Sequence, residues 1–277
     1  MKFCKMHGIG NDYIYFNCME QELSDPAALA IKLSHRNFGI GGDGIVMICS
    51  SDIADAKMRM FNLDGSEGKM CGNAIRCVGK FLYDNGIVVK NTIAIETLSG
   101  IKYLDLTIND SKVSSVKVDM GAPILIPHDI PVKLDGDMVV NREVQIDGKP
   151  YHITCVSMGN PHCIVFVDDV DNIDIASIGP KFEHAPIFPE QVNTEFVQCL
   201  DEGTLKMRVW ERGSGETLAC GTGACATAVA AVLNNKASKN SDIVIKLIGG
   251  DLVIRYTDDT VYMTGEATKV FDGTIEI

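Results

Sequence analysis

Two short stretches of this chain are versions of each other and lie a fixed distance apart. The first is Met70-Cys71-Gly72-Asn73-Ala74, and the second is Ala219-Cys220-Gly221-Thr222-Gly223. Their cysteines are separated by 149 positions (220 − 71). The same offset aligns Met58-Arg59 with Met207-Arg208, Phe61 with Trp210, Glu67 with Glu216, and Gly10-Asn11 with Gly159-Asn160. One offset shared by separate motifs is typical of an internal duplication.

The duplication predicts two similar domains. Stretches that look like junctions begin at Met120 and Thr264. We therefore expect a first domain of residues 1–119 plus 266–277 and a second of residues 120–265. The chain of 277 residues is long enough for two such domains.

Hydrophobic periodicity and turn residues predict a mixed α/β chain. Each cysteine stretch follows a strand and a polar loop and opens a helix. The residues of 224–233 are almost all apolar or small, which predicts a helix buried on every side. Helices are expected at 26–34, from Cys71 to Asp84-Asn85-Gly86, at 173–178 and at 224–233. Strands are expected at 2–6, 13–16, 45–49, 56–62, 92–96, 102–108, 113–119, 144–146, 152–157, 163–167, 195–199, 205–210, 243–247, 252–256 and 261–264.

Charge and hydropathy exclude several classes of partner. The net charge is −12, and no dense run of Lys and Arg is present, which argues against nucleic acid or an anionic membrane. The N-terminus lacks the apolar core of a secretion signal, and no apolar run approaches the ~18 residues of a membrane span. We expect a cytoplasmic protein that acts on a small molecule.

A glycine-rich stretch gives a false signal for a dinucleotide site. Gly39, Gly41 and Gly44 match G-x-G-x-x-G. That fingerprint must follow a strand and open a helix. Here it follows a predicted helix and opens a predicted strand, so we read these glycines as a sharp turn.

A cysteine at a helix N-terminus can act as an acid or a base beside a bound carboxylate. The first N–H groups of a helix have no partner within it and carry partial positive charge, which stabilises a thiolate and binds carboxylates. We expect Cys71 and Cys220 to face each other across a cleft and to hold one α-carboxylate between their helix ends. One thiolate would then remove the α-proton of an amino acid while the other thiol returns a proton to the opposite face. This chemistry needs no pyridoxal phosphate.

The other eight cysteines carry no such signal. Because C-x-x-C pairs are absent, we expect neither a zinc site nor a thioredoxin-like pair, and no bound metal. We expect these eight to be small buried residues. They are Cys4, Cys18, Cys49, Cys77, Cys155, Cys163, Cys199 and Cys225.

These motifs resemble the diaminopimelate epimerase family. The resemblance rests on the stretches 3–13, 61–67, 70–77, 158–162, 210–213 and 219–223, which are spread over the whole chain. It implies a cofactor-independent isomerase that converts LL- to meso-2,6-diaminopimelate for lysine and peptidoglycan synthesis. It also implies two pseudo-symmetric domains, each a curled, mostly antiparallel sheet around a central helix, with the active site between them, and often a homodimer.

The resemblance also implies roles for individual residues. Cys71 and Cys220 match the acid/base pair, and His162 and Glu211 match positions that assist the thiols. The α-carboxylate would be held by Gly72, Asn73, Gly221 and Thr222. Further substrate contacts match Asn11, Asn62, Asn160, Asn193, Glu211 and Arg212. The chain departs from the family at Gly44, where many members have a substrate-contacting Gln.

Two other functions remain open. A related cofactor-independent racemase, for example of histidine, would share the cysteine pair, because distal contacts decide the substrate. Proline racemases are disfavoured, because they typically have His where Asn73 stands. A non-catalytic redox or metal sensor is disfavoured by the cysteine spacing.

Overall fold

The computed structural model describes residues 1–276, and the chain divides into two compact units. Unit 1 comprises Met1–Asp119 and Thr264–Ile277, and unit 2 comprises Met120–Met263. The return to unit 1 therefore begins at Thr264 rather than at residue 266.

Unit 1 is a mixed sheet with two helices. Its elements are β1 (Lys2–Gly8), β2 (Asn11–Asn17), α1 (Pro26–Ser34), β3 (Gly44–Cys49), β4 (Ala56–Asn62), β5 (Glu67–Gly68), α2 (Gly72–Asp84), β6 (Thr92–Thr97), β7 (Gly100–Asn109), β8 (Lys112–Asp119) and β18 (Thr268–Thr274). Unit 2 contains η1 (Pro127–Asp129), β9 (Arg142–Ile146), β10 (Lys149–Ser157), β11 (Pro161–Phe166), α3 (Ile175–Glu183), β12 (Asn193–Asp201), β13 (Thr204–Glu211), β14 (Gly215–Thr217), α4 (Gly221–Leu233), β15 (Asp242–Leu247) and β16 (Gly250–Tyr256), and β17 (Val261–Gly265) leads back to unit 1.

The two units pair their strands in the same sequence of directions. In unit 1 the order β1-β2-β3-β4-β6-β7 alternates antiparallel and parallel pairs. In unit 2 the order β10-β11-β12-β13-β15-β16 does the same. The short strands β5 and β14 each pair antiparallel with the strand before them. The sequence offset therefore corresponds to a repeated topology.

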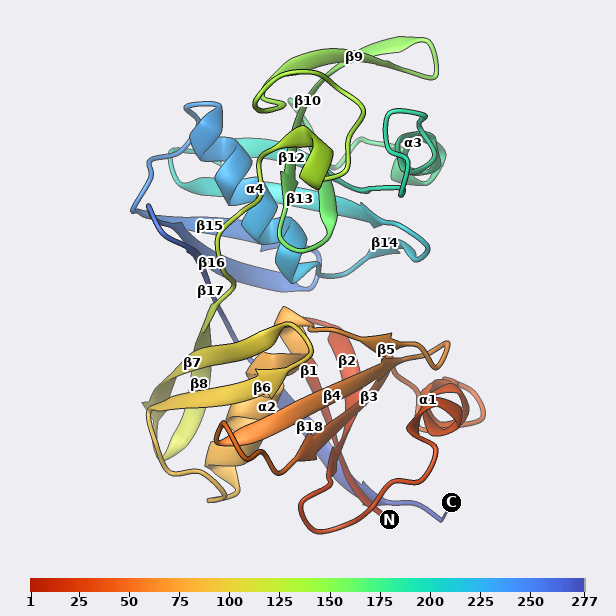
Figure 1. Cartoon of the computed structure of the whole chain (residues 1–277), viewed down its shortest axis with the longest axis vertical. Coiled ribbons are helices and arrows are strands. Elements are labelled where there is room, and N and C mark those ends of the chain that lie inside the picture. The colour runs from red at the N-terminus through yellow and green to blue at the C-terminus, as the bar shows by residue number, and fades with distance from the viewer. Residues whose placement is uncertain (277) are drawn as a thin grey trace. The chain divides into compact units, whose positions relative to one another are not determined.

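Each sheet wraps around one helix (Figure 1). In unit 1, α2 contacts β1, β2, β7 and β8, and in unit 2, α4 contacts β10, β11, β12, β15 and β16. The face of α2 predicted from its periodicity, Ile75, Val78, Gly79 and Leu82, is buried. A Cβ at Gly79 would lie 2.9 Å from Leu104 Cδ2, so the absent side chain lets the helix approach the sheet closely.

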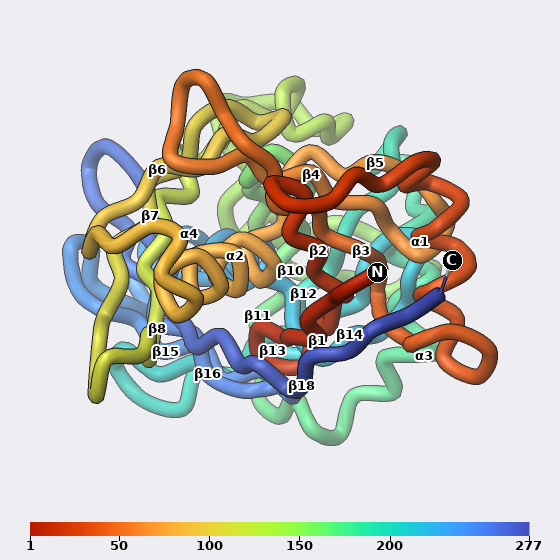
Figure 2. Tube along the Cα trace, turned by 90° about the horizontal axis from the view of Figure 1, so that it is seen from below, coloured from red at the N-terminus to blue at the C-terminus, as the bar shows by residue number. Residues whose placement is uncertain are grey.

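Helix α4 lacks a polar face and is buried along most of its length, from Gly223 to Ala231 without interruption. This confirms the prediction from its apolar sequence. Both ends of the chain belong to unit 1, where β18 pairs antiparallel with β1. Figure 2 shows these two strands side by side, and the Met1 amino group donates to the Ile275 carbonyl at 2.6 Å.

Most predicted elements are present, and the differences have local causes. The polar loop predicted before each cysteine stretch contains a short strand, β5 in unit 1 and β14 in unit 2, because each folds back on the strand before it. Helix α3 was expected at 173–178, but it begins after the capping Asp174 and continues past Pro180 to Glu183. His162, just before the strand predicted at 163–167, is already part of β11, which pairs with β10 and β12.

The prediction that eight cysteines are buried is wrong at three positions. Cys18 and Cys49 are half-buried and Cys199 is exposed, whereas Cys4, Cys77, Cys155, Cys163 and Cys225 are buried. All three exceptions lie at or near strand ends, where the sheet no longer covers them. No helix among residues 1–276 is long and apolar enough to cross a membrane.

Candidate active site

The first helix end is capped by a cysteine. Cys71 is the N-cap of α2, with extended backbone, and its Sγ accepts a hydrogen bond from the Ala74 N–H at 3.5 Å. The Cys71 carbonyl accepts the first helical bond, from Ile75 N–H at 2.9 Å. A thiol in this position takes the place of the Ser or Asp side chain that usually caps a helix, and it lies in the positive field of the helix end.

Asn11, from the start of β2, contacts the Cys71 sulfur. The thiol donates to Asn11 Oδ1 at 3.5 Å, and Asn11 Nδ2 donates to Asp43 Oδ2 at 2.7 Å. Asp43 also accepts from the Asp12 N–H and from Arg36. The carboxylate thereby fixes the amide with its oxygen toward the thiol. Sequence reasoning missed Asp43, which lies in the glycine-rich stretch without a motif of its own.

The first turn of α2 is held by a buried arginine. Arg76 is fully buried and donates to the Gly72 carbonyl and to Asn73 Oδ1, both at 3.0 Å. It also donates to the Glu266 carbonyl at 3.2 Å, which ties the helix to the segment returning at the C-terminus. Asn73 is buried, and its side-chain oxygen contacts Arg76 within the first turn of α2. Asn62, at the end of β4, donates to Ser66 Oγ at 3.1 Å within the turn that follows.

The second helix end repeats the arrangement in a more buried setting. Cys220 is the N-cap of α4, and its Sγ accepts from the Gly223 N–H at 3.4 Å and lies 3.5 Å from Thr222 Oγ1. Only 5% of Cys220 is exposed. Burial, followed by the negative charges of Glu211 and Glu195, raises the pKa of its thiol well above 9.0. Burial and the nearby carboxylates therefore favour the protonated thiol of Cys220.

A buried pair of polar side chains, His162 and Glu195, lies near Cys220. His162 Nδ1 is 2.7 Å from Glu195 Oε1, and both side chains have no exposed surface. His162 Nε2 is 3.1 Å from Asn160 Oδ1, and Asn160 Nδ2 donates to Thr222 Oγ1 at 3.3 Å. With its amide nitrogen on Thr222, Asn160 presents an oxygen to the ring, so both nitrogens of His162 have a partner.

Glu195 is a site residue that sequence reasoning missed. It lies in the middle of β12, and its Oε2 is buried without a hydrogen-bond partner among residues 1–276. A Cβ at Gly223 would lie 2.5 Å from Glu195 Oε1 and 3.2 Å from the Cys220 sulfur. This explains the second glycine of the motif. The sequence around it, with Thr194 before and Gln198 after, gives no signal that sets this glutamate apart.

Glu211 contacts the second thiol from the end of β13. Its carboxylate interacts with the Cys220 sulfur and accepts a hydrogen bond from Thr217 Oγ1 at 2.5 Å. Burial raises the pKa of Glu211 above its ordinary value of 4.5, although the Thr217 and Cys220 contacts oppose this.

Asn193 and Arg212 lie next to one another in unit 2. Asn193 is buried, its Nδ2 donates to the Pro161 carbonyl at 3.1 Å, and its Oδ1 accepts from the Arg212 N–H at 3.0 Å. The Arg212 guanidinium donates through Nη1 to the Glu190 carbonyl at 2.8 Å. The buried Asn193 side chain therefore joins two backbone segments, at Pro161 and Arg212. The Arg212 side chain is partly exposed.

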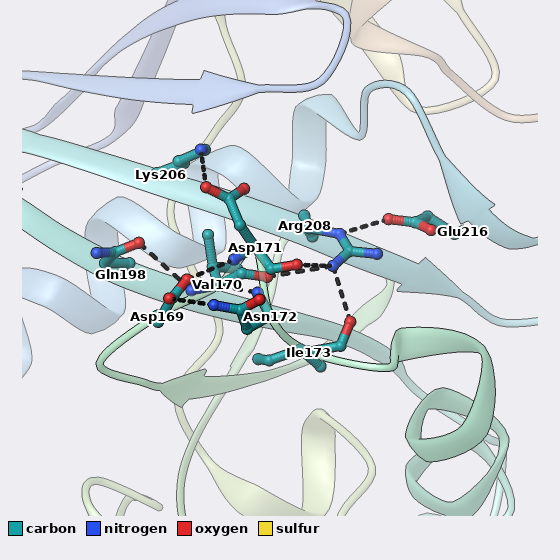
Figure 3. Close-up of polar contacts among 9 residues, drawn as sticks. All are labelled: Asp169, Val170, Asp171, Asn172, Ile173, Gln198, Lys206, Arg208 and Glu216. Carbon is teal, nitrogen blue, oxygen red and sulfur yellow. Dashed lines mark hydrogen bonds and ion pairs between the residues drawn. The ribbon is translucent and has the colours of Figure 1, made fainter.

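The hairpin that precedes each cysteine is held by an equivalent ion pair. Arg59 Nε donates to Glu67 Oε1 in unit 1, and Arg208 Nε donates to Glu216 Oε1 in unit 2, both at 2.7 Å. These pairs are related by the sequence offset. Arg208 also binds a second segment (Figure 3). Its Nη1 donates to the carbonyls of Val170, Asp171 and Ile173 at 2.9–3.3 Å. One arginine thus fixes both the hairpin and the loop before α3.

Gly44 has a structural reason to be glycine. It stands at the start of β3 opposite Asn62, and a Cβ there would lie 2.1 Å from the Phe61 carbonyl oxygen and 2.8 Å from the Tyr13 ring. In this backbone a glutamine at position 44 would collide with the neighbouring strand.

The predicted site residues thus form two groups, one in each unit. Asn11, Gly72 and Asn73 surround Cys71, with Asn62 at the end of β4. Asn160, His162, Glu211, Gly221 and Thr222 surround Cys220, with Asn193 and Arg212 behind them. Among residues 1–276, no group of three or more His, Cys, Asp or Glu side chains is placed to hold a metal ion. Each group offers a thiol and a helix N-terminus, which suits proton transfer beside a bound carboxylate.

Comparison with known proteins places the chain among enzymes. The family model described as "Diaminopimelate epimerase" matches residues 3–126 and 154–270. The diaminopimelate epimerase of Acetivibrio thermocellus is 56% identical over 100% of this chain and 99% of its own. That of Methanococcus maripaludis strain C5 is 53% identical over the whole of both chains.

Solved structures share the fold at low identity. A Bacillus anthracis protein of the PhzF family is similar with a TM-score of 0.71 at 16% identity, covering 100% of this chain and 99% of that one. A hydroxyproline epimerase from Agrobacterium vitis, with bound trans-4-hydroxy-L-proline, has a TM-score of 0.66 at 14% identity, covering 99% and 90%. These likenesses confirm the predicted class of α/β fold.

Proposed function

This chain belongs to the diaminopimelate epimerase family, and from that premise we propose that it interconverts LL- and meso-2,6-diaminopimelate by a two-base mechanism. The reaction serves lysine and peptidoglycan synthesis. The observation that carries the proposal is that each unit caps its central helix with a cysteine whose sulfur accepts an N–H of the first turn.

In the proposed mechanism one thiolate removes the α-proton of the substrate and becomes a thiol. The electron pair of the broken C–H bond moves into the α-carboxylate, which is held by N–H groups of Gly72, Asn73, Gly221 and Thr222. The other thiol then delivers its proton to the opposite face of the carbon and becomes a thiolate. Positioned proton transfer supplies about 10²–10⁴-fold of the rate, and the fixed N–H dipoles supply the larger share.

We propose that Cys220 starts the reaction as the proton donor. The support is that burial and two carboxylates raise the pKa of its thiol. Cys71 then acts as the base in that direction, and the roles reverse in the other. Glu211, which contacts the Cys220 sulfur, and His162, paired with Glu195, assist the thiols.

The second amino-acid centre of diaminopimelate needs groups for a carboxylate and an ammonium. The Arg212 guanidinium supplies a fork for the carboxylate, since only its Nη1 has a hydrogen bond to the described residues. Asn11, Asn62, Asn160, Asn193 and Glu211 supply the remaining contacts. Asn193 contributes indirectly, because it holds the Arg212 backbone.

Proton NMR in D₂O tests the function. Reduced protein is mixed with LL-diaminopimelate without added cofactor, and we expect deuterium at the α-carbon together with formation of the meso isomer. Histidine in a parallel sample separates the related racemase. The diaminopimelate assignment fails if folded, reduced protein exchanges no α-proton of that substrate.

Serine variants test the two bases. Cys71→Ser and Cys220→Ser should each lose at least about 100-fold in epimerisation, because a hydroxyl is a far weaker acid than a thiol and does not ionise near neutral pH to supply the base. Cys199→Ser, at an exposed cysteine in unit 2, is the matched control and should keep full activity. Full activity in either helix-cap variant would contradict a two-base mechanism.

We further propose that the protein acts in the cytoplasm as a homodimer without pyridoxal phosphate. The family resemblance supports the dimer and the cofactor-free reaction, and the acidic sequence without a predicted secretion signal supports the cytoplasm. Light scattering coupled to size exclusion measures the mass in solution, and a monomer would contradict the dimer. Activity that appears only on addition of pyridoxal phosphate would contradict the cofactor-free reaction.

A further inference from the structure

Two cysteines outside the active site lie next to each other at the end of a strand pair. Cys18 directly follows β2, and Cys49 is the last residue of β3. The strands are parallel, with Asn17 opposite Ile48, and the Cys18 N–H donates to the Ile48 carbonyl at 2.8 Å. The register therefore places Cys18 beside Cys49, on the same face of the sheet. Neighbouring strands are about 4.8 Å apart, within the Cα range that a disulfide spans.

This thiol pair can be reached from solvent. Both residues are half-buried, and they line an open groove of about 480 Å³. The other lining residues are Met19, Glu20, Gln21, Glu22, Leu23, Met47 and Arg59, so both acidic and basic groups border it. Asn11, the candidate-site residue of β2, lies at the opposite end of that strand, seven residues from Cys18 and therefore about 23 Å away at the usual rise per residue. The pair is thus separate from the Cys71 site.

Positive charge favours the thiolate of one partner. The hydrogen bond from Cys18, followed by the charges of Arg59 and Lys57, lowers the pKa of Cys49 to about 7. The pKa of Cys18 is raised by the same hydrogen bond and by burial. One thiol is therefore ready to attack while its neighbour stays protonated.

We propose that Cys18 and Cys49 form a peroxide-reactive dithiol site that closes to a disulfide, with Cys49 as the attacking thiol and Cys18 as the resolving thiol. The Cys49 thiolate attacks one oxygen of hydrogen peroxide, the O–O bond breaks, and hydroxide leaves, which gives a sulfenic acid. The Cys18 sulfur then attacks the Cys49 sulfur, the S–O bond breaks, and water leaves. The two thiols lose two electrons and the peroxide is reduced to water.

A second cysteine pair in the chain provides an internal control. Cys155 and Cys163 are directly opposite each other in β10 and β11. Both are buried, and burial followed by a hydrogen bond from Cys155 raises the pKa of Cys163. They share the adjacency of Cys18 and Cys49 but have neither the access nor the nearby cations. Proximity alone would oxidise both pairs, whereas our proposal predicts that Cys18–Cys49 oxidises first.

The test is differential alkylation of the full-length, reduced protein after brief exposure to hydrogen peroxide near pH 7, read by peptide mass spectrometry. We expect a Cys18–Cys49 disulfide that dithiothreitol reverses, while Cys155 and Cys163 stay reduced. Without peroxide, Cys49 should alkylate several-fold faster than the exposed Cys199, because the pKa of Cys49 is lowered to about 7 whereas burial raises that of Cys199. Equal oxidation of both pairs, or no Cys18–Cys49 disulfide, overturns the proposal.

Single variants separate the two roles. In Cys18→Ser, peroxide should leave a sulfenic acid on Cys49 that dimedone traps. In Cys49→Ser, Cys18 should remain a thiol. Circular dichroism confirms folding, and alanine variants repeat the test if a serine variant is unfolded. Trapping of sulfenic acid on Cys18 rather than on Cys49 contradicts the assignment of the attacking thiol.

Discussion

The buried pair of Glu195 and His162 gives the sharpest quantitative prediction. Both side chains have no exposed surface, and Nδ1 and Oε1 are 2.7 Å apart. Glu195→Gln keeps the shape and replaces one carboxyl oxygen by an amide nitrogen. A hydrogen bond to a charged group contributes about 1.5–3 kcal/mol, and a buried polar group left without its partner costs about 1–3 kcal/mol. Because glutamine retains one bond, we expect a loss of about 2–3 kcal/mol in the free energy of unfolding of unit 2.

Trp210 makes this loss measurable in unit 2 alone. It is the single tryptophan of the chain and lies on β13, where its indole nitrogen donates to Glu183. Urea unfolding followed by tryptophan fluorescence therefore reports on this unit. In a thermal scan the expected loss corresponds to a fall of about 4–12 °C in Tm. Glu202→Gln, at the exposed turn after β12, is the control and should stay within about 0.5 kcal/mol.

A double-mutant cycle with His162→Gln tests whether the effect belongs to the pair. The coupling free energy should be at least about 1.5 kcal/mol, since residues in contact depart from additivity by this order. Glu195→Gln should also lower kcat/KM for diaminopimelate, because His162 would lose its partner. If Glu195→Gln unfolds like the Glu202 control, the buried contact between Glu195 and His162 does not stabilise this unit and the reasoning is refuted.

Three further predictions concern Arg212, Gly44 and Glu211. Arg212→Ala should lower kcat/KM for diaminopimelate about 10–100-fold, mainly through KM, since a hydrogen bond to a charged group contributes about 1.5–3 kcal/mol. Unchanged turnover in steady-state kinetics would show that Arg212 does not contact the substrate. Gly44→Gln should destabilise the protein by at least about 3 kcal/mol in thermal unfolding, because the new side chain would overlap the Phe61 backbone. A Tm equal to that of wild type would show that the neighbouring strand moves aside easily. The raised pKa of Glu211 means that its protonated form is favoured by the fold, so its contribution to stability is present below about pH 4.5 and is lost as pH rises through its folded pKa. Unfolding free energies measured against pH should show this fall in wild type and not in Glu211→Gln, and parallel curves would contradict it.

Sequence alone predicted the features that depend on residues close together along the chain. The helices after Cys71 and Cys220 follow from their apolar residues, small residues and stop signals, and both cysteines are the observed caps. The strand at 56–62 has its predicted bounds, and the helix after Asp25-Pro26 begins where the capping rule places it. The constant offset between the motifs corresponds to the repeated order of strand directions. These features are readable because caps, turns and periodicity involve residues within a few positions of each other.

The tertiary structure decided everything that depends on pairing between distant strands. Glu195 looks like an ordinary strand residue until β11 places His162 beside it. Asp43 gains its role because β2 and β3 are neighbours, which brings Asn11 within 2.7 Å. The same pairing puts Cys18 beside Cys49 at an uncovered strand end, where sequence composition predicted burial. Residues 31 or more positions apart become neighbours only through sheet register, and burial of their charges follows from that register rather than from local sequence.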